Sequence, residues 1–373
     1  MKIVIVVPTY NEIENVRRLV PVLADEFKKI NHNCHVLVVD GNSPDGTGDL
    51  VKSFEKTYPF VHLLLEKKKA GLGAAYAYGF KHAIKEMSAE ALIEMDADFQ
   101  HDPKDIKRLL DEIDNGYDYV IGSRFVKGGS IPQEWALYRK LFSWGGSFVS
   151  KLVLGIFNVK DFTTGYKASR VRGFADKLDL DNIISKGFAY KIELLYRMHK
   201  LGARIKEIPI EFGLRDRGTS KMESNNLTDS LKVVFTIRYN ENKNFFKFLV
   251  VGSIGFAVDS ILANILRLGP LTSTLASLVS GFIAMVTTYL LNNFWSFSDR
   301  KQVSGTAKRL VGFAVYVVSS YLPIIFRSWL ISWTVRTFED NFIIFNVAFV
   351  VGVIIGLIWN FTVYSRLIWR NKK

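Results

Sequence analysis

Cysteine is scarce in this chain of 373 residues, and the first two thirds of the sequence lack any long hydrophobic run. The single Cys34 excludes an internal disulfide framework and agrees with a reducing compartment. The opening segment MKIVIVVPTY contains too short an apolar stretch for a secretory signal, so nothing in it suggests export. No internal repeat or low-complexity tract stands out. We therefore expect the N-terminal part to be a globular domain on the cytoplasmic side.

The chain also lacks a recognisable nucleic-acid-binding module, although its formal net charge is +13. Such a charge suits either nucleic acid or an anionic membrane surface. The basic residues cluster beside the hydrophobic segments and in a few loops, which favours lipid. The sequence therefore predicts a lipid bilayer as a partner and no nucleic acid.

Long apolar runs begin only after Asn244, and there are four of them. Each reaches the length of about 18 residues that a membrane-spanning helix requires. The third run contains Pro323 and Arg327, and the first contains Asp259, which either has a function or finds a polar partner in a neighbouring helix. We predict a transmembrane domain at residues 245–373, with four helices in two hairpins, after an amphipathic connector at 227–244. The predicted spans are Phe248–Leu266, Leu271–Phe297, Leu310–Val335 and Phe342–Tyr364.

Basic residues set the expected orientation of this integral membrane protein. They are concentrated in the loop at 298–309 and in the C-terminal tail, whereas the two opposite turns show little excess. Because positively charged loops stay on the cytoplasmic side, both basic ends are expected there. With an even number of spans, the N-terminal domain and both termini are then cytoplasmic.

The N-terminal part alternates between two periodicities, and we expect it to form a catalytic domain at residues 1–226. β-branched or apolar runs predict strands at 2–7, 35–40, 61–66, 90–96 and 117–125, and helical spacing predicts helices at 14–27 and 71–84. Strands that alternate with helices indicate an α/β fold, a wound and mostly parallel sheet with helices on both faces. Such sheets bind ligands at the carboxyl ends of their strands. Polar residues stand at those ends: Thr9 to Glu12, Asp40, Asp96 to Gln100, and Arg124.

The segment EMDADFQHDP, residues 94–103, places three oxygen donors behind an apolar run. In an extended segment Asp96, Asp98 and Gln100 would point the same way. Hard oxygen donors of this kind suit Mg²⁺ or Mn²⁺, particularly when phosphate oxygens complete the shell. The alternative is that the acids only cap a helix, with Asp102 as N-cap and Pro103 at the first helical position. Capping leaves Asp96 and Asp98 unexplained.

Two weaker signals have simpler structural explanations. The GLG at 71–73 begins like a dinucleotide fingerprint, but the third glycine is missing and the segment follows the third strand. Close packing of a turn against a helix explains it better. His101 adjoins the acidic run and could bind a metal, yet a histidine at a helix entry is more often structural.

Six segments in order resemble one known family: VVPTYNE, VVDGNSPDGT, GLGAAYAYGFKHA, DADFQHDP, GSRF and RDRGTSK. They are similar to those of dolichol-phosphate mannose synthases, which are nucleotide-sugar glycosyltransferases, over about residues 1 to 240. The resemblance implies a glycosyltransferase A-type, Rossmann-like domain. FLVVGSIGFAVD and YLLNNFWSFSD resemble a small four-span membrane family, GtrA-like, that often accompanies lipid-linked sugar enzymes.

The resemblance implies a site for the nucleotide sugar, with residues of the first two strands at the nucleotide and Val38 and Asp40 beside the base. The implied donor-binding residues are Pro8, Tyr10, Glu12, Val38, Asp40, Asp96, Ala97, Asp98, Gln100, Arg124, Arg215 and Lys221. The implied metal ligands are Asp98 and Gln100, with Asp96 nearby. Relatives often have a second aspartate where this chain has Gly41, and Arg217 is an additional charge between Arg215 and Lys221.

The chemistry expected of such an enzyme depends on cations. The leaving group is a nucleoside diphosphate, and a divalent ion with Arg215 and Lys221 would stabilise its developing charge. The acceptor, a polyprenyl phosphate, has a second pKa of about 6, so it is mostly dianionic and needs no general base. We therefore assign Asp161 no catalytic role. The candidate catalytic residues are Asp98, Arg124, Arg139 and Ser143, the last one helical turn beyond Arg139.

The segment at 135–157 mixes aromatic residues and leucines with Arg139, Lys140 and Lys151, and Gly145 and Gly146 interrupt it. It is too charged to span a membrane and too apolar for a solvated face. We expect two helices that lie in the membrane interface. An ordinary amphipathic core helix is the alternative.

The sequence thus predicts inverting transfer of mannose from GDP-mannose to dolichyl (polyprenyl) phosphate, which gives dolichyl-phosphate β-mannose. One alternative keeps the reaction and changes the sugar, as in a polyprenyl-phosphate glucose synthase that uses UDP-glucose. Another is a lipid-linked sugar translocase whose N-terminal domain senses nucleotide.

Overall fold

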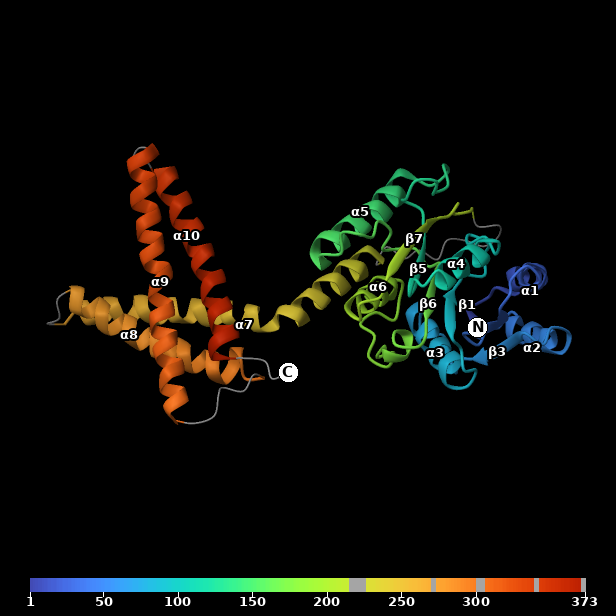
Figure 1. Ribbon diagram of the computed structural model, residues 1–373, viewed down its shortest axis with the longest axis horizontal. Coiled ribbons are helices and arrows are strands. Elements are labelled where there is room, and N and C mark those ends of the chain that lie inside the picture. Colours follow the sequence, from blue (N-terminus) through green and yellow to red (C-terminus); the bar gives the residue numbers. More distant parts are fainter. Residues whose placement is uncertain (215–225, 270–272, 300–305, 339–341, 370–373) are drawn as a thin grey trace. The chain divides into compact units, whose positions relative to one another are not determined.

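The computed structural model describes residues 1–214, 226–269, 273–299, 306–338 and 342–369 (Figure 1). The chain divides into two compact units, Met1–Arg238 and Tyr239–Lys373. Helix α7 (Asn226–Arg267) begins in the first unit and ends in the second, and Asn242 interrupts it with non-helical angles of φ −113° and ψ 20°.

The first unit is built on one sheet of seven strands in the order β3-β2-β1-β4-β6-β5-β7. All neighbouring strands are parallel except β6, which runs antiparallel to β4 and to β5. The α/β fold with a mostly parallel sheet is therefore confirmed. The strands are β1 (Lys2–Thr9), β2 (Asn33–Asp40), β3 (Val61–Leu65), β4 (Ala91–Glu94), β5 (Tyr119–Ser123), β6 (Lys167–Arg170) and β7 (Ile205–Pro209).

Three features of the sheet differ from the expectation. Strands β6 and β7 have no counterpart among the five predicted strands. β6 has the sequence KASR, whose Lys167 and Ser169 are buried polar residues, so no apolar run reveals it. Strand β1 continues through Pro8 to Thr9, with Pro8 opposite Val39 of β2.

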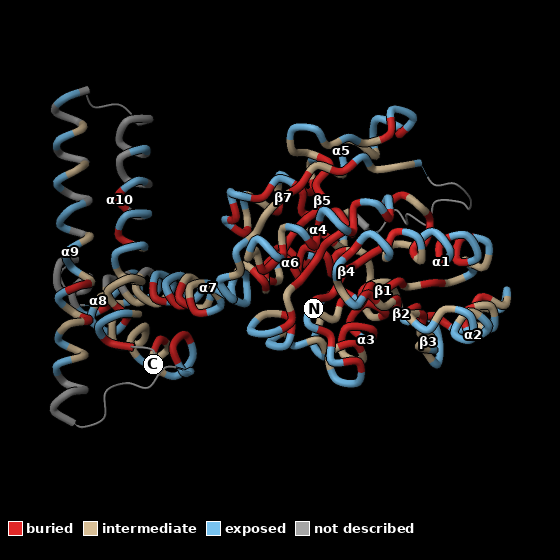
Figure 2. Tube along the Cα trace, turned by 45° about the vertical axis from the view of Figure 1, so that its right-hand side comes forward, coloured by how far each residue is buried: buried red, intermediate tan, exposed pale blue. Residues whose placement is uncertain are grey.

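Helices cover both faces of the sheet because successive residues of the central strands point to opposite sides. Ile3, Ile5 and Val7 pack with the helices α1 and α4, whereas Val4 and Val6 pack with α3 and α6 (Figure 1). These central strands are buried on both faces, and exposed residues lie mainly on the outer sides of the helices (Figure 2). The helices are α1 (Ile13–Phe27), α2 (Thr47–Thr57), α3 (Leu72–Lys85), α4 (Asp105–Asp114), α5 (Leu137–Leu154) and α6 (Tyr190–Lys200), with the 3₁₀ turn η1 (Ala175–Lys177).

Close packing explains the GLG segment at the start of α3. A Cβ on Gly71, whose φ is +115°, would lie 2.4 Å from the carbonyl oxygen of Lys186. A Cβ on Gly73 would lie 2.7 Å from Cβ of Tyr190. Both glycines are therefore required where the helix meets the segment before α6, which agrees with the structural interpretation.

The segment at 135–157 forms one helix, α5, where two were expected. Gly145 and Gly146 lie inside it without breaking it. Small or polar residues, Gly146, Ser147 and Ser150, form most of its buried face. Its large apolar side chains point outward: Leu137, Tyr138, Leu141, Phe142, Trp144, Phe148 and Leu152 are exposed, as is Phe157 just beyond its end. An ordinary core helix has the opposite arrangement.

The second unit is helical. Besides the rest of α7 it contains α8 (Ser273–Leu291), η2 (Asn292–Ser296), α9 (Thr306–Phe338), α10 (Phe342–Val363) and η3 (Tyr364–Ile368), where η2 and η3 are π-helical turns. Within the described residues one stretch, Leu227–Leu266 of α7, is long and apolar enough to cross a membrane, and Val311–Pro323 and Ile354–Ile368 are shorter apolar helices. The four predicted spans coincide with α7 to α10, and four crossings remain a prediction.

Close helix contacts in this unit occur at small residues. A Cβ on Gly255 of α7 would lie 2.3 Å from Cγ2 of Thr288 in α8, and one on Gly356 of α10 would lie 2.8 Å from Cβ of Pro323 in α9. Small residues allow helices to approach closely in a membrane. Asp259 accepts a hydrogen bond of 2.6 Å from the hydroxyl of Ser280, so it has the polar partner that the structural alternative required.

Candidate functional site

The carboxyl ends of β1, β2, β4, β5 and β7 lie along one edge of the sheet, because these strands are mutually parallel. The amino end of β6 lies at the same edge, since β6 runs in the opposite direction. This edge brings together polar segments that are far apart in the sequence. It is therefore the position at which the sequence predicts the site.

The acidic segment behind β4 is a turn and not an extended strand, so the argument from alternation was wrong. Phe99 has a φ of 60°, and the amide of Gln100 donates a 3.2 Å hydrogen bond to Oδ1 of Asp98. Aspartate often bonds in this way to an amide two residues ahead and thereby stabilises a turn. The prediction of Asp96, Asp98 and Gln100 as metal ligands consequently stays a prediction, without support from the alternation argument.

Asp96 lies at the surface of the site, with 29% of its side chain exposed. Its Oδ1 accepts a 3.2 Å hydrogen bond from the Tyr76 hydroxyl. Its Oδ2 is 4.0 Å from Nζ of Lys191, a lysine on α6 that is buried. Tyr76 and Lys191 were not predicted from the sequence, and they reach Asp96 from helices on one face of the sheet.

The His101 side chain stabilises this turn through a hydrogen bond to its main chain. Its side chain is fully buried, its Nδ1 accepts a 3.1 Å hydrogen bond from the Asp96 amide, and its ring stacks on Tyr166 with 4.8 Å between centroids. Burial lowers the pKa of His101 to about 4, so the ring is neutral and carries its proton on Nε2. Because Nδ1 is occupied by the main chain, His101 has the structural role that was the favoured interpretation.

Asp98 and Gln100 are buried side chains at the same edge, and each is 5% exposed. The amide nitrogen of Gln100 donates a 3.2 Å hydrogen bond to the carbonyl of Gly213, which turns its Oε1 away from that contact. A carboxylate and an amide oxygen fixed in this way match the oxygen donors that Mg²⁺ and Mn²⁺ prefer. In the part of the chain that the structure describes, no three His, Cys, Asp or Glu side chains are grouped so that they could hold a metal ion.

Arg124, which follows β5, forms a bidentate ion pair with Asp161. Its Nε lies 2.8 Å from Oδ2 and its Nη2 lies 2.7 Å from Oδ1. Nη2 also donates a 2.6 Å hydrogen bond to the hydroxyl of Thr163, whose Oγ1 is 3.4 Å from Oγ of Ser143 on α5. The structure thus connects two predicted residues, Arg124 and Ser143, through Thr163, which the sequence did not identify.

Asp161 is completely buried, and it also accepts hydrogen bonds from the amides of Arg124 and Thr163. Burial alone would raise the pKa of this carboxyl, but Arg124 and these amides outweigh burial and lower it. An ionised carboxylate held in this way positions an arginine and does not take up protons. This agrees with the absence of a general base from the expected mechanism.

Arg139 lies in the first turn of α5, partly buried, and its guanidinium carbon is 3.7 Å from the ring centroid of Trp135. The aromatic face orients the guanidinium, since such stacking favours arginine. Arg215, Arg217 and Lys221 lie outside the described residues.

Asp40 is a buried anchor at the end of β2. Its carboxylate accepts hydrogen bonds from the hydroxyl of Thr9 at 2.8 Å, from the amide of Ser43 at 2.8 Å and from the hydroxyl of Ser43 at 2.6 Å. These contacts connect the ends of β1 and β2. Asp40 therefore shapes the predicted nucleotide pocket mainly by fixing its walls.

The other predicted nucleotide-binding residues surround this anchor. Pro8, Tyr10 and Glu12 are partly exposed, whereas Val38 and Ala97 are buried. The Tyr10 ring lies under the ammonium group of Lys69, with 4.3 Å between Nζ and the ring centroid. Glu12 accepts a 2.6 Å hydrogen bond from the side chain of Asn15 and its amide donates to the hydroxyl of Thr47.

A buried network of charges lies beneath the acidic turn. Glu94 of β4 is opposite Lys167 of β6 and accepts a 2.5 Å hydrogen bond from the Tyr190 hydroxyl. The ammonium group of Lys167 donates a 2.9 Å hydrogen bond to the carbonyl of Lys191. Burial lowers the pKa of Lys167 to about 8, although Glu94 acts in the other direction. The network fixes the helix that carries Lys191 next to Asp96.

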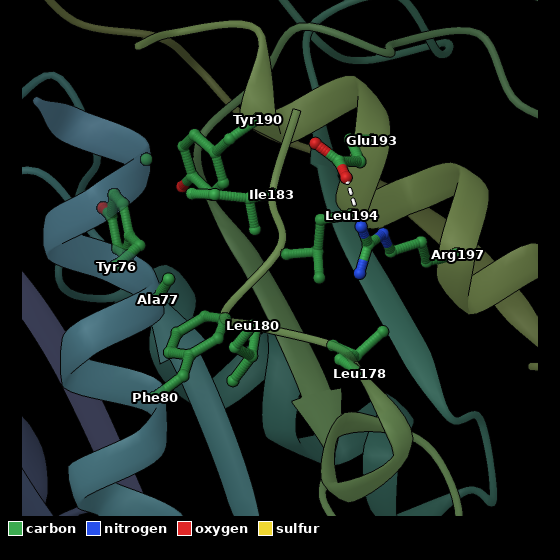
Figure 3. Close-up of a pocket in the computed structure, with 11 residues that line it drawn as sticks. Tyr76, Ala77, Phe80, Leu178, Leu180, Ile183, Tyr190, Glu193, Leu194 and Arg197 are labelled. Atoms are coloured by element: carbon green, nitrogen blue, oxygen red, sulfur yellow. Dashed lines mark hydrogen bonds and ion pairs between the residues drawn. The ribbon is translucent and has the colours of Figure 1, made fainter. Parts of the chain in front are cut away.

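A small cavity lies between α3 and α6, and Tyr76 and Tyr190 are among the residues that line it (Figure 3). Its volume is about 20 Å³, enough for one water molecule. Apolar side chains line most of it, and an ion pair between Glu193 and Arg197 at 2.5 Å lies at its rim. It is too small for a substrate. A larger open cavity of about 480 Å³ adjoins the acidic turn, between Phe99, Pro132 and Gly213.

Comparison with known protein families identifies both parts of the chain. Residues 4–177 match glycosyl transferase family 2, and residues 247–369 match the GtrA/DPMS transmembrane domain.

Similar curated proteins have related names. An undecaprenyl-phosphate mannosyltransferase from Micrococcus luteus is 42% identical over 60% of this chain and 88% of its own length. A polyprenol monophosphomannose synthase from Mycolicibacterium smegmatis is 39% identical over 61% of this chain and 83% of its own length. A dolichol-phosphate mannosyltransferase from Pyrococcus furiosus is 29% identical over 99% of both chains.

Among solved structures, mannosyl-3-phosphoglycerate synthase from Rubrobacter xylanophilus is similar with a TM-score of 0.47 and 13% identity, over 65% of this chain and 75% of that one. The sequence relatives identify the family, because one of them is 42% identical over 88% of its own length. The chain belongs to the polyprenyl-phosphate glycosyltransferases of glycosyl transferase family 2 and carries a GtrA/DPMS transmembrane domain.

Proposed function

We propose that this protein transfers mannose from GDP-mannose to dolichyl or another polyprenyl phosphate, with inversion, and so forms a β-linked lipid phosphate mannose. The observation that carries the proposal is the position of Asp98 and Gln100 at the same sheet edge as the Arg124–Asp161 pair, from which Thr163 leads to α5. The names of the relatives support mannose and a polyprenyl phosphate.

The donor's diphosphate is assigned to the acidic turn. When bound there, Mg²⁺ or Mn²⁺ supplies positive charge that stabilises the diphosphate leaving group. Asp98 and Gln100 would hold the ion, and Asp96, fixed by Tyr76 and Lys191, would complete that side of the pocket. The resemblance adds Arg215 and Lys221 as cations for the same diphosphate.

The acceptor phosphate is assigned to the side of the site formed by Arg124, Arg139 and Ser143. A phosphate dianion attacks the sugar without losing a proton, so the enzyme must mainly overcome the repulsion between two anions and align them. Asp161 neutralises part of the charge of Arg124 and fixes its direction. Arg139, which lies on α5 and stacks on Trp135, then supplies a second cation on this side of the site.

The exposed apolar face of α5 fits a lipid acceptor. Trp144 and Phe148 stack with 5.5 Å between ring centroids, and both rings are exposed. Monomeric soluble proteins rarely expose a contiguous apolar patch of this kind, whereas a helix in the membrane interface buries it among lipid chains. We propose that α5 lies in the interface of the cytoplasmic leaflet, where it receives the phosphate end of the polyprenol.

A transfer assay with a panel of sugar nucleotides tests the proposal. Purified full-length protein in detergent is incubated with polyprenyl phosphate, Mn²⁺ and, in separate reactions, labelled GDP-mannose, UDP-glucose or GDP-glucose. We expect label in the organic phase from GDP-mannose only, and mild acid should release it as mannose. If only UDP-glucose gave label in the organic phase, the donor would be UDP-glucose and the proposal of GDP-mannose would be wrong. If no donor gave label in the organic phase, the result would contradict glycosyl transfer itself.

A further inference from the structure

The side chains of Tyr10, Glu66 and Lys69 surround the backbone of Gly41. A Cβ built on Gly41 would lie 3.3 Å from Cδ2 of Tyr10, 3.4 Å from Cβ of Lys69 and 3.5 Å from Oε2 of Glu66. Tyr10, Gly41 and Glu66 directly follow β1, β2 and β3, which are adjacent strands. The three residues therefore meet at the edge of the sheet assigned to the nucleotide.

Hydrogen bonds between main-chain groups fix this arrangement. The amide of Gly41 donates a 3.0 Å hydrogen bond to the carbonyl of Thr9, and the amide of Glu66 donates a 2.9 Å hydrogen bond to the carbonyl of Asp40. The hydrogen bond to Asp40 thus fixes the backbone position from which the Glu66 side chain extends. Its carboxylate borders the space beside Gly41, with Oε2 in van der Waals contact with the position that a Cβ would take.

The carboxylate of Glu66 is half-buried, and within residues 1–214 and the other described ranges it has no hydrogen bond or ion pair. Lys69, three residues after Glu66, lies over the Tyr10 ring and does not form an ion pair with the Glu66 carboxylate. Burial, and then the nearby Asp40, raise the pKa of Glu66, as expected for a carboxylate without a cation. A ligand with hydrogen-bond donors would supply the contacts that the protein does not.

Asp40 cannot take this role, because Thr9 and Ser43 already donate three hydrogen bonds to its carboxylate. Gly41 has no side chain to offer. Among the residues that surround the Gly41 backbone, Glu66 is therefore the acid that faces the pocket.

We propose that Glu66 is the residue that selects the base of the donor nucleotide, by accepting hydrogen bonds from N1–H and the N2 amino group of guanine. An ionised carboxylate has acceptors only. Guanine presents two adjacent donors on its Watson–Crick edge, whereas uracil presents one N–H between two carbonyl oxygens, and adenine and cytosine place an acceptor beside their amino group. Lys69 covers one face of the Tyr10 ring, so a base that stacks on this ring would use the opposite face. The inference rests on the proposed function in placing a nucleoside diphosphate at this edge.

The test measures base recognition without catalysis. Binding of GDP, IDP and UDP to the full-length protein in detergent with Mg²⁺ is measured by calorimetry. IDP is GDP without the N2 amino group, so the ratio of the two affinities reports that contact alone. We expect the wild type to bind GDP about tenfold or more tightly than IDP or UDP, the range of one good bidentate contact.

Glu66→Gln keeps the size of the side chain but replaces one acceptor oxygen with a donor. The GDP to IDP ratio should then fall close to one, and UDP should bind more tightly than in the wild type, since an amide matches the N3–H and O4 of uracil. Glu55→Gln, an exposed carboxylate on α2, is the matched control and should retain the wild-type ratio. An unchanged ratio in Glu66→Gln would overturn the proposal.

Glu66→Ala provides a second variant, because it removes the carboxylate altogether and should weaken GDP binding at least tenfold. If either variant fails to fold, the affinities of the wild type still test the proposal. Equal affinity of the wild type for GDP and IDP, or tighter binding of UDP than of GDP, would overturn the assignment of Glu66. Both results leave hexose transfer to a lipid phosphate intact. Conversely, a clear preference for GDP without any transfer would contradict the proposed function only.

Discussion

Arg124 and Asp161 meet through two hydrogen bonds, Nε to Oδ2 at 2.8 Å and Nη2 to Oδ1 at 2.7 Å, with side chains that are 5% and 0% exposed. They are 37 residues apart in the sequence, and the pair connects the end of β5 to the segment before β6. A buried ion pair is sensitive to the loss of one partner, since the other charge is then left without compensation. The arginine assigned to the phosphates thus depends on an acid that takes no part in proton transfer.

The first prediction concerns this pair. Asp161→Asn should lower the free energy of unfolding of the first unit by about 3 to 5 kcal/mol, the usual effect of breaking a buried pair, and should reduce turnover strongly. Urea unfolding and a transfer assay measure the two effects. The double variant Arg124→Met with Asp161→Leu should recover stability without recovering turnover. Equal stability of Asp161→Asn and the wild type would refute the argument.

The second prediction concerns His101 and the Asp96 amide. His101→Phe retains a ring against Tyr166 but removes the acceptor, so the amide of Asp96 loses its hydrogen bond. A lost hydrogen bond of this kind corresponds to about 1 to 1.5 kcal/mol, or roughly tenfold in the affinity for the metal nucleotide. His101→Asn retains an acceptor near the same place and should bind close to the wild type. Equal losses in both variants would show that only packing matters.

The third prediction is a pH dependence of stability that comes from Lys167. Burial lowers its pKa from 10.5 to about 8 in the folded protein. Between pH 8 and 10.5 the folded state has therefore released a proton that the unfolded state still holds. Stability rises with pH wherever the unfolded state binds more protons, so this lysine should add about 3 kcal/mol across that interval and nothing below it.

Lys167→Met should remove this rise. Tyrosines begin to ionise in the unfolded state near pH 10, so the quantity to compare is the difference between wild type and variant in urea unfolding at pH 7.5, 9 and 10. A difference that changes in favour of the wild type as the pH rises agrees with the lowered pKa. A constant difference would show that Lys167 keeps an ordinary pKa in the folded protein.

The fourth prediction separates acceptor from donor. Arg139→Ala should raise the KM for polyprenyl phosphate about tenfold or more, because a charge-assisted contact is lost, while the affinity for the donor nucleotide stays within twofold. Lys140→Ala is the matched control: its ammonium group donates a 2.7 Å hydrogen bond to the carbonyl of Gln133, and it should change neither value by more than twofold. Loss of donor binding in Arg139→Ala would assign this arginine to the other substrate.

The parts of the fold that local periodicity controls could be predicted from the sequence. β1 to β5 and the helices α1 and α3 carry apolar residues at the spacing of their elements, and the structure places them there. β6 could not be found in this way, because Lys167 and Ser169 are buried by the network around Glu94 and not by an apolar pattern. Gly145 and Gly146 were read as a break in α5, but small side chains on its buried face allow a continuous helix.

The candidate site shows the same division. Sequence motifs identify residues at the strand ends, because parallel strands bring those ends together. The acidic turn was misjudged, since the side chain of Asp98 and the positive φ of Phe99 produce a turn that alternation does not reveal. Asp161, Lys191 and Glu66 acquire their roles through contacts across the fold, and the only local signal was the Asp-Phe-Thr-Thr turn at 161–164.

The central claim is that a divalent ion held by Asp98 enables hexose transfer to a lipid phosphate. The most direct measurement follows labelled mannose from GDP-mannose into the organic phase, with wild type and Asp98→Ala, at a series of Mn²⁺ concentrations. We predict transfer by the wild type that requires both Mn²⁺ and polyprenyl phosphate, and a loss of at least a hundredfold in Asp98→Ala, the scale expected when electrostatic stabilisation of a leaving group is removed. Undiminished, metal-dependent transfer by Asp98→Ala would contradict the account.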